Sequence, residues 1–256
     1  MTEHYINQML AAWPGSEKGK ERFAATAMAL ALRDPVLRDC SPASKLIALN
    51  ECAKLGLIPD RHLGHIWLVP FRNKGVQEVQ CIPGYKGYIE LARRSGLITT
   101  VETGLVYEND HLDFVKGSSP HLIHKPWWDN GASSAGQIKC VYCIAHVRNA
   151  TVPQIEVMHI TEVMAIKKRS RAGNNGPWVT DFEMMARKTP IRRAAKLWSL
   201  SPELAALLML DDAVELGEPQ FATTVRNPSL PEMELTDGNS GQQPEVEPSE
   251  GGEEAD

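Results

Sequence analysis

The sequence predicts an α+β protein, and three observations support this. Apolar residues recur at helical spacing in the N-terminal region and again after residue 160. The region between them changes to the alternation that is typical of β-strands. At 256 residues, with 43% apolar and 23% charged side chains, the chain has the composition of an ordinary globular protein with a sizeable core.

Two helices are expected before the first strand. Residues 18–33 carry apolar side chains at helical spacing, and an Asp-Pro pair ends the segment. The second helix begins with a serine cap followed by proline at residues 41–42, and it should end at Gly56. We assign residues 1–40 to an N-terminal helical segment that could contact another subunit.

The first strands are expected to form a β-hairpin. Residues 65–71 and 76–82 have extended patterns and flank a four-residue loop that contains Gly75. A short amphipathic helix should follow near Tyr85 and end at Gly96. Further β segments are expected at residues 98–108, 111–115, 121–124, 136–147 and 153–159.

Three helices are expected after the strands. They should span residues 161–169, 180–198 and 201–210. The second begins with a capping box formed by Thr180 and Glu183, and Pro190 should kink it.

The charge of the chain is segregated. Residues 218–256 hold ten acidic residues against Arg226, so residues 1–217 carry a net charge of +4 although the whole chain carries −5. Prolines, glycines and serines replace apolar residues there, which predicts a disordered acidic tail. A basic body with an acidic tail is common in proteins that meet nucleic acid.

Residues 82–96 form the first candidate binding motif. Two glycines allow close approach of the backbone, and aromatic side chains alternate with cations. Such a pattern suits stacked bases linked by phosphates. The alternative is that the tyrosines pack half-buried and the arginines complement the helix dipole. The candidate residues are Tyr85, Lys86, Tyr88, Arg93 and Arg94.

The segment 167–196 is the second candidate, with nine bases against two acids. In the helix expected over 180–198, the residues four apart should form a cationic face: Lys188, Arg192 and Lys196. Residues seven apart should form the buried stripe: Met184, Ile191 and Trp198. Such a helix could dock on the core and bind phosphates in a salt-sensitive manner, and the alternative is a solvated face. The remaining bases are Lys167, Lys168, Arg169, Arg171, Arg187 and Arg193.

Three motifs, in this order along the chain, resemble the RecT family of phage single-strand annealing proteins. They are GHIWLVPF at 64–71, the stretch 82–96, and PWVTDF at 177–182 continuing through residues 191–193. The resemblance covers about residues 40–215. It implies an ATP-independent protein that coats single-stranded DNA, anneals it to its complement and assembles into rings or helical filaments. The implied fold is a curved antiparallel sheet with flanking helices that border a basic DNA-binding groove.

The resemblance also implies a site and partners. Residues 41–217 would be the annealing core, with DNA between the helix near Tyr85 and the helix 180–198. Phosphates would meet Lys86, Arg93, Arg94, Arg187, Lys188, Arg192, Arg193 and Lys196, while Tyr85, Tyr88 or Trp178 would stack or shape the groove. Implied partners are single-stranded DNA, the annealed duplex, further copies of the chain, a phage exonuclease and a host single-strand-binding protein. No cofactor, metal or catalytic residue is implied.

The N-terminus lacks a basic region followed by an apolar run, and the apolar stretch 24–32 is far shorter than the roughly 20 residues of a membrane helix. We therefore expect a cytoplasmic protein in a bacterial cell. Five scattered cysteines argue against a disulfide framework. Cys140 and Cys143 have zinc-like spacing, but strand alternation would place them on opposite faces.

Two other functions stay open. Asp110 or Asp113 with Gln137 and Lys139 loosely resembles a metal-dependent nuclease, which would need carboxylates for Mg²⁺. The second alternative function is that of a passive protein that coats single-stranded DNA. No phosphate-binding loop of the Gly-x-x-x-x-Gly-Lys-Ser/Thr type is present in the sequence. The pair at 127–128, Trp127 and Trp128, could stack on bases, anchor a loop or contact a subunit.

Overall fold

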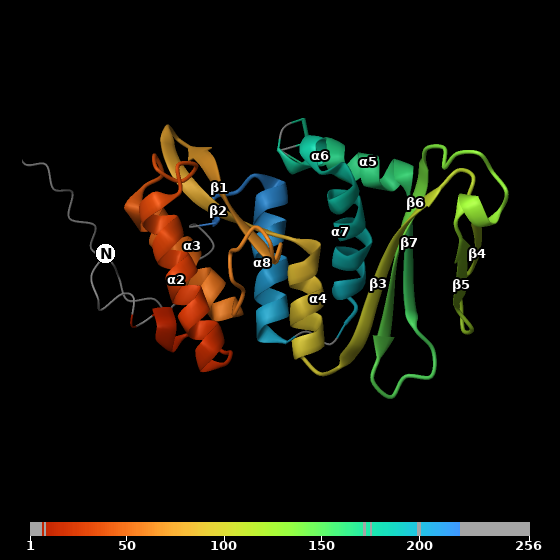
Figure 1. The fold of residues 1–256 in the computed structure, drawn as a ribbon, viewed down its shortest axis with the longest axis horizontal. Helices are drawn as coiled ribbons and strands as arrows, with labels where there is room; N and C mark the ends of the chain where they lie inside the picture. Colours follow the sequence, from red (N-terminus) through yellow and green to blue (C-terminus); the bar gives the residue numbers. More distant parts are fainter. Residues whose placement is uncertain (1–6, 8, 171–172, 175, 199–200, 221–256) are drawn as a thin grey trace, which may run out of the picture.

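The computed structural model describes residues 7, 9–170, 173–174, 176–198 and 201–220, and it confirms the α+β class. Figure 1 shows an elongated arrangement in which helices α2, α3, α8, α4 and α7 stand side by side. The β1–β2 hairpin lies over the α3–α8 end, and the β3–β6–β7 sheet lies beyond α7. The hairpin and the three-stranded sheet therefore pack against opposite ends of this row of helices.

Both expected N-terminal helices are present. Helix α2 spans Glu17–Arg33, and the Ser16 hydroxyl accepts a hydrogen bond from the backbone N–H of Gly19. Helix α3 spans Pro42–Leu55 and ends at Gly56, whose positive φ of 62° is the left-handed conformation that favours glycine. Phe23 of α2 is fully buried, so this helix is packed into the same core as α3.

The hairpin has one face in the core and one face outside it. Strands β1 (Ile66–Asn73) and β2 (Val76–Pro83) are antiparallel, with Trp67 opposite Ile82. Ile66 and Cys81 are buried in the core beside α3. Because successive side chains alternate between faces, Trp67 lies on the opposite face from Ile66.

Side chains from other elements cover the outer edge of β2. The backbone N–H of Val79 donates to the Ser44 hydroxyl at 3.0 Å. The Gln220 amide accepts from the N–H of Cys81 at 2.7 Å and donates to the carbonyl of Cys81 at 2.8 Å. The expected tail from residue 218 therefore begins with residues that dock on the core. The expected disorder of residues 221–256 lies outside the described residues.

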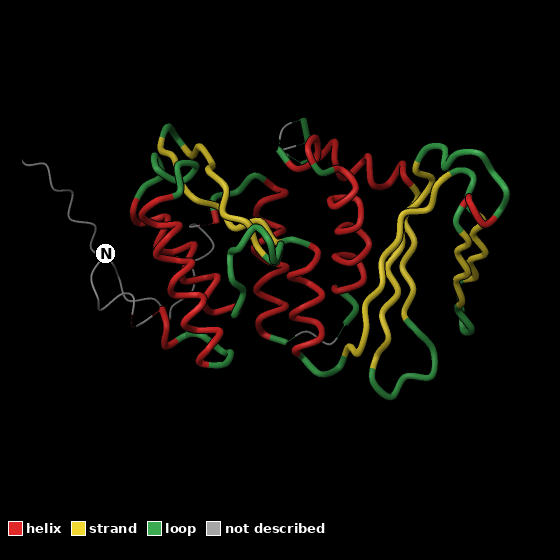
Figure 2. Tube along the Cα trace, viewed as in Figure 1, coloured by secondary structure: helices red, strands yellow, loops and turns green. Residues whose placement is uncertain are grey.

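The remaining strands form small antiparallel sheets rather than the single curved sheet that we expected. Figure 2 shows a three-stranded sheet beside a separate two-stranded one. The first has the order β3–β6–β7, and the second pairs β4 with β5. The bounds are α4 Tyr85–Arg94, β3 Ile98–Tyr107, β4 His111–Val115, β5 His121–Lys125, η1 Trp127–Asp129, β6 Ile138–Val147 and β7 Gln154–His159.

The C-terminal helices are present, but they differ from expectation in several respects. The helix expected over 180–198 is divided at Asp181 into α6 (Pro177–Thr180) and α7 (Phe182–Ala195). The Thr180 hydroxyl donates to the Asp181 carboxylate at 2.6 Å instead of forming the expected capping box. Helix α7 continues through Pro190. The other bounds are α5 Ile160–Arg169 and α8 Pro202–Leu216.

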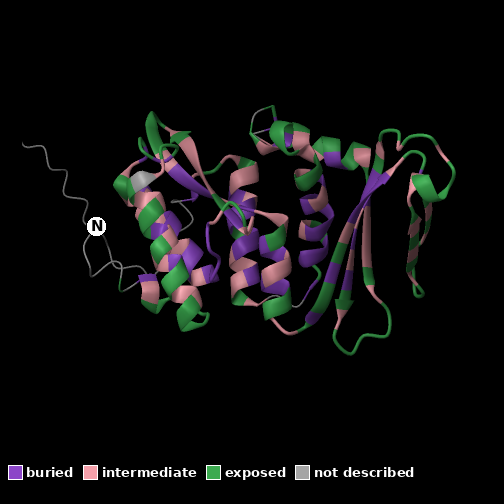
Figure 3. Cartoon of the chain, viewed as in Figure 1, coloured by how far each residue is buried: buried purple, intermediate pink, exposed green. Residues whose placement is uncertain are grey.

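Helix α7 joins two apolar clusters, and Figure 3 shows its buried surfaces. Ile191 and Ala195 belong to the larger cluster, which includes residues of α2, α3, α4, α8 and the hairpin. Ala186 belongs to a smaller cluster on the inner face of the β3–β6–β7 sheet. All five cysteines are free and buried, in agreement with the expected lack of a disulfide framework. In the described part of the chain, each helix is too short or too polar to cross a membrane.

Candidate nucleic-acid interface

A groove of about 410 Å³ lies between the hairpin with the start of α4 on one side and α6 with the start of α7 on the other. Its walls are mainly apolar, and its charged residues are few. The lining residues are Arg61, Gly64, Trp67, Val69, Ile82, Pro83, Gly84, Tyr85, Lys86, Gly176, Pro177, Thr180, Asp181, Met184, Met185 and Lys188. The first and third family-like motifs, distant in sequence, thus share one surface.

Glycines set the shape of this groove. A Cβ atom at Gly84 would collide with the carbonyl oxygen of Gly64, and one at Gly87 would collide with that of His65. Only glycine therefore lets the first turn of α4 pack directly against the turn before β1. This contact confirms the close backbone approach expected from the 82–96 motif. It also places Tyr85 and Lys86 in the groove with Trp67.

Trp67 is a groove residue that sequence reasoning did not select. Its side chain lies on the outer face of the hairpin, and the residue is 39% exposed. A signal was present in the sequence, because Trp67 alternates with Ile66 and Leu68, which pack against the core. An indole on the opposite face of a half-buried strand must face either solvent or a ligand.

The 82–96 motif divides between the groove and the core. Tyr85 and Lys86 line the groove, whereas Tyr88 is fully buried. The Tyr88 hydroxyl donates to Asp211 at 2.7 Å, so its ring is not available to stack on a base. Burial and the neighbouring Asp211 raise the pKa of Tyr88 well above its usual value. Arg93 is exposed at the far end of α4.

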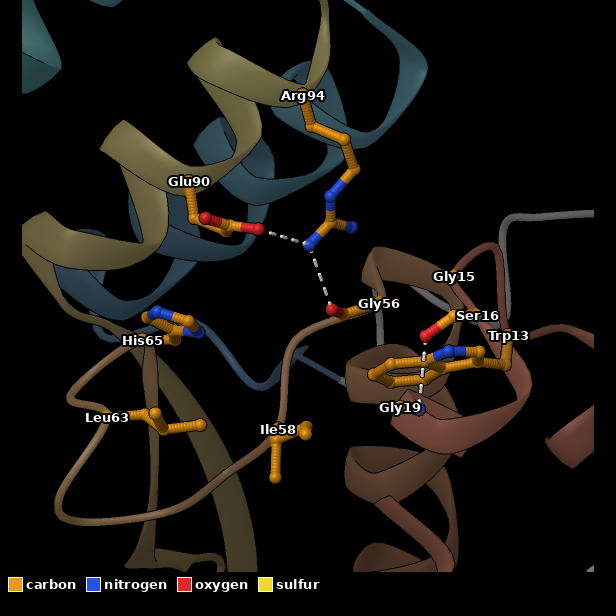
Figure 4. A pocket seen from close by; sticks show the side chains of 10 residues that line it. All are labelled: Trp13, Gly15, Ser16, Gly19, Gly56, Ile58, Leu63, His65, Glu90 and Arg94. Atoms are coloured by element: carbon orange, nitrogen blue, oxygen red, sulfur yellow. Dashed lines mark hydrogen bonds and ion pairs between the residues drawn. The ribbon is translucent and has the colours of Figure 1, made fainter. Parts of the chain in front are cut away.

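Arg94 is engaged within the protein, in a separate hollow of about 270 Å³. Its guanidinium donates to the carbonyls of Leu55 and Gly56 at 3.0 and 3.1 Å and contacts Glu90 at 3.1 Å. Figure 4 shows Arg94 with Glu90 and Gly56; Trp13 also lines this hollow. Arg94 therefore satisfies the C-terminal carbonyls of α3, which is a structural role.

The expected cationic face of α7 points mainly at α8. The Lys188 ammonium lies 2.5 Å from Asp211, and both side chains are buried. Arg192 forms ion pairs with Asp211, Asp212 and Glu215. Burial lowers the pKa of Lys188, although the Asp211 carboxylate opposes that shift. These two cations are neutralised within the fold, so the expectation that they face phosphates is corrected.

The other cations of α7 also have partners in the protein. The Arg193 guanidinium contacts Glu156 at 3.1 Å and Glu162 at 2.8 Å. Lys196 lies 3.5 Å from Asp212. The Arg187 guanidinium donates to the carbonyl of Thr103 at 2.9 Å. Arg193 and Lys196 stay partly exposed, whereas Arg187 holds α7 against β3.

Two assignments near α7 have different outcomes. Trp178 is 3% exposed and packs near Phe182 in the smaller cluster, so its ring is not free to stack on a base. Met184 was expected in the buried stripe, but it is 40% exposed and lines the groove. Ile191 and Trp198 are buried as expected. The position of Arg171 lies outside the described residues.

The residues of the alternative nuclease site have structural contacts. The Asp110 carboxylate accepts from the backbone N–H groups of Tyr107 and Trp127, each at 2.7 Å, and lies 2.9 Å from His124. Burial opposes its charge, but these hydrogen bonds outweigh that effect and hold the pKa of Asp110 below its usual value. The described residues contain no group of three or more His, Cys, Asp or Glu side chains that could hold a metal ion. Trp128 is exposed and packs edge-on against Trp127.

An α+β protein whose surface groove combines an aromatic and aliphatic wall with exposed cations is suited to a chain of flat, charged units. The chain belongs to the RecT family, whose model matches residues 21–224. Protein RecT of Escherichia coli (strain K12) is 38% identical over 211 residues, which cover 81% of this chain and 77% of that protein. The uncharacterized protein YqaK of Bacillus subtilis (strain 168) is 27% identical over 207 residues, covering 76% and 65% respectively.

Membership of this family implies a single-strand annealing protein of DNA recombination, and such proteins are generally non-catalytic. The match begins within α2 and ends beyond α8, so it contains every element that lines the groove.

Proposed function

We propose that this protein binds single-stranded DNA in the groove between the hairpin and α6–α7 and anneals it to a complementary strand without ATP. The setting would be homologous recombination of a phage, in the cytoplasm of its bacterial host. Further copies of the chain would assemble along the DNA, and a phage exonuclease and a host single-strand-binding protein would cooperate with them.

The groove supports this proposal because it brings a cation and aromatic rings together on one exposed surface. Lys86 is exposed in the first turn of α4 and has no ion-pair partner among the described residues. The dipole of α4 adds to the attraction for an anion at this end of the helix. Arg61, at the edge of the groove, is largely exposed and lies 3.7 Å from Asp34.

One assay separates the proposed function from its alternatives. Two labelled complementary strands are incubated with the protein in the absence of ATP. Faster duplex formation supports annealing, protection without faster annealing supports a passive coating protein, and shortened strands support a nuclease. A strict requirement for ATP would contradict the proposal.

Lys86 provides the matched test of the groove. Lys86→Ala should weaken binding to every single-stranded sequence by a similar factor and reduce the salt dependence of binding by about one phosphate contact. The free energy of unfolding should change by no more than about 0.5 kcal/mol, because the side chain is exposed. Lys18→Ala, an exposed lysine on α2, is the control. If Lys86→Ala and Lys18→Ala bound DNA equally well, Lys86 would not contact the DNA.

A further inference from the structure

The chemistry of the groove differs from that of a pure phosphate channel. Its lining includes two aromatic and several aliphatic or thioether side chains, but only three basic residues. One of those, Lys188, is already neutralised by Asp211. A surface that only follows a phosphate backbone would present mainly cations and hydrogen-bond donors. Most of this surface instead suits flat apolar groups.

We propose that the groove takes unpaired nucleobases and that Trp67 is the residue on which a base stacks. This inference rests on the proposed function, because it names the part of the DNA that the same site holds. Every base has a π-face, so stacking on an indole is tolerant of sequence. Lys86 in the same groove would meet the phosphate next to the stacked base.

The position of Trp67 supports this role. Its ring lies beside Gly84, where an added Cβ would come 3.4 Å from the indole nitrogen. The ring is therefore set against the first turn of α4, while 39% of the residue stays accessible. A large ring held in one place by a hairpin and a helix loses little conformational entropy when it binds a base.

The opposite wall is adaptable. Met184 and Met185 line it, and Met184 is exposed. Thioether side chains are flexible and polarizable, so they can pack against purines and pyrimidines alike. A base held between this wall and Trp67 would be hidden from a complementary strand. The groove should therefore prefer unpaired strands, and annealing would release the base into the duplex.

The test compares ligands that share their charge but differ in bases. The affinity of the protein is measured for a thymidine oligonucleotide, for an abasic oligonucleotide of the same length, and for duplex DNA. The wild type should bind the thymidine strand on the order of tenfold more tightly than the abasic strand. Trp67→Ala should lose most of this preference, whereas its affinity for the abasic strand should stay unchanged.

Two further variants complete the experiment. Trp67→Phe retains an aromatic face and should keep much of the preference, which separates stacking from a general loss of structure. Trp128→Ala removes an exposed tryptophan outside the groove and should bind like the wild type. Equal affinity of the wild type for thymidine and abasic strands would overturn the inference alone. Binding to neither strand would overturn the proposed function itself.

Discussion

Helices α4 and α7 each contribute a lysine to the groove. The two lysines show that burial and ion-pair partners decide what a charged side chain does. Lys188 of α7 is buried 2.5 Å from Asp211, whereas Lys86 of α4 is exposed without an ion-pair partner among the described residues. Both residues line the same groove. A buried cation whose partner is removed is costly, while an exposed one is almost free to meet a ligand. Basic residues in a nucleic-acid protein therefore need not all contact nucleic acid.

The largest effect is expected from Asp211→Ala. This change leaves the Lys188 ammonium and the Tyr88 hydroxyl buried without their partner and weakens the support of Arg192. The free energy of unfolding should fall by about 3–5 kcal/mol, as measured by denaturant titration. Asp212→Ala is the control, because the Asp212 side chain is 43% exposed. This change should lower the free energy of unfolding by less than about 1 kcal/mol. Equal stability of the two variants would show that the buried cluster is not structural.

An intermediate effect is expected from two truncations that separate the docked residues from the acidic ones. A chain that ends at Gln220 should retain its stability and bind single-stranded DNA as well as or better than the full chain. The reason is that it loses nine acidic residues against Arg226. A chain that ends at Gly217 also loses the hydrogen bonds of Gln220 to Cys81, so its stability should fall by about 1–2 kcal/mol. The stabilities of the two truncated chains are compared by thermal unfolding. Identical unfolding midpoints would contradict a stabilising role for Gln220.

The smallest effect distinguishes two neighbouring arginines. Arg94→Ala should destabilise the fold by about 1 kcal/mol, because the carbonyls of Leu55 and Gly56 lose a donor. Arg93→Ala should change stability by no more than about 0.5 kcal/mol, since Arg93 is exposed. If Arg93 binds a phosphate, its loss should also reduce the salt dependence of DNA binding by about one contact. If Arg93→Ala destabilised the fold more than Arg94→Ala, the structural role assigned to Arg94 would be wrong.

The elements with strong local signals were predictable from the sequence. Ser41 before a proline, and Gly56 after an apolar turn, fix the ends of α3 through their own backbone preferences. The hairpin followed in the same way from two alternating runs around a glycine-containing loop. The division of the strands among three sheets was not predictable, because strand pairing depends on contacts far apart in the chain.

The candidate site was predictable in part. Its location next to the 82–96 motif followed from glycines and aromatic residues, and Tyr85 and Lys86 do line the groove. The role of α7 was misjudged because the acidic partners of its bases lie on other elements: those of Lys188 and Arg192 on α8, and those of Arg193 on β7 and α5. Charge counting within one helix cannot reveal such partners. The burial of Tyr88 did have a signal, since Tyr88, Leu91 and Ala92 share one helical face.

The covered edge of β2 limits how the hairpin can meet another protein. A strand with free backbone groups is a template for a further strand, and such edges promote aggregation. Ser44 occupies the backbone N–H of Val79, and Gln220 occupies both backbone groups of Cys81. On the other side, Pro70 of β1 lacks the N–H that a continuous ladder requires. A further strand would therefore lose hydrogen bonds at Val79 and Cys81 on one edge and at Pro70 on the other, which disfavours edge-to-edge pairing of the hairpin.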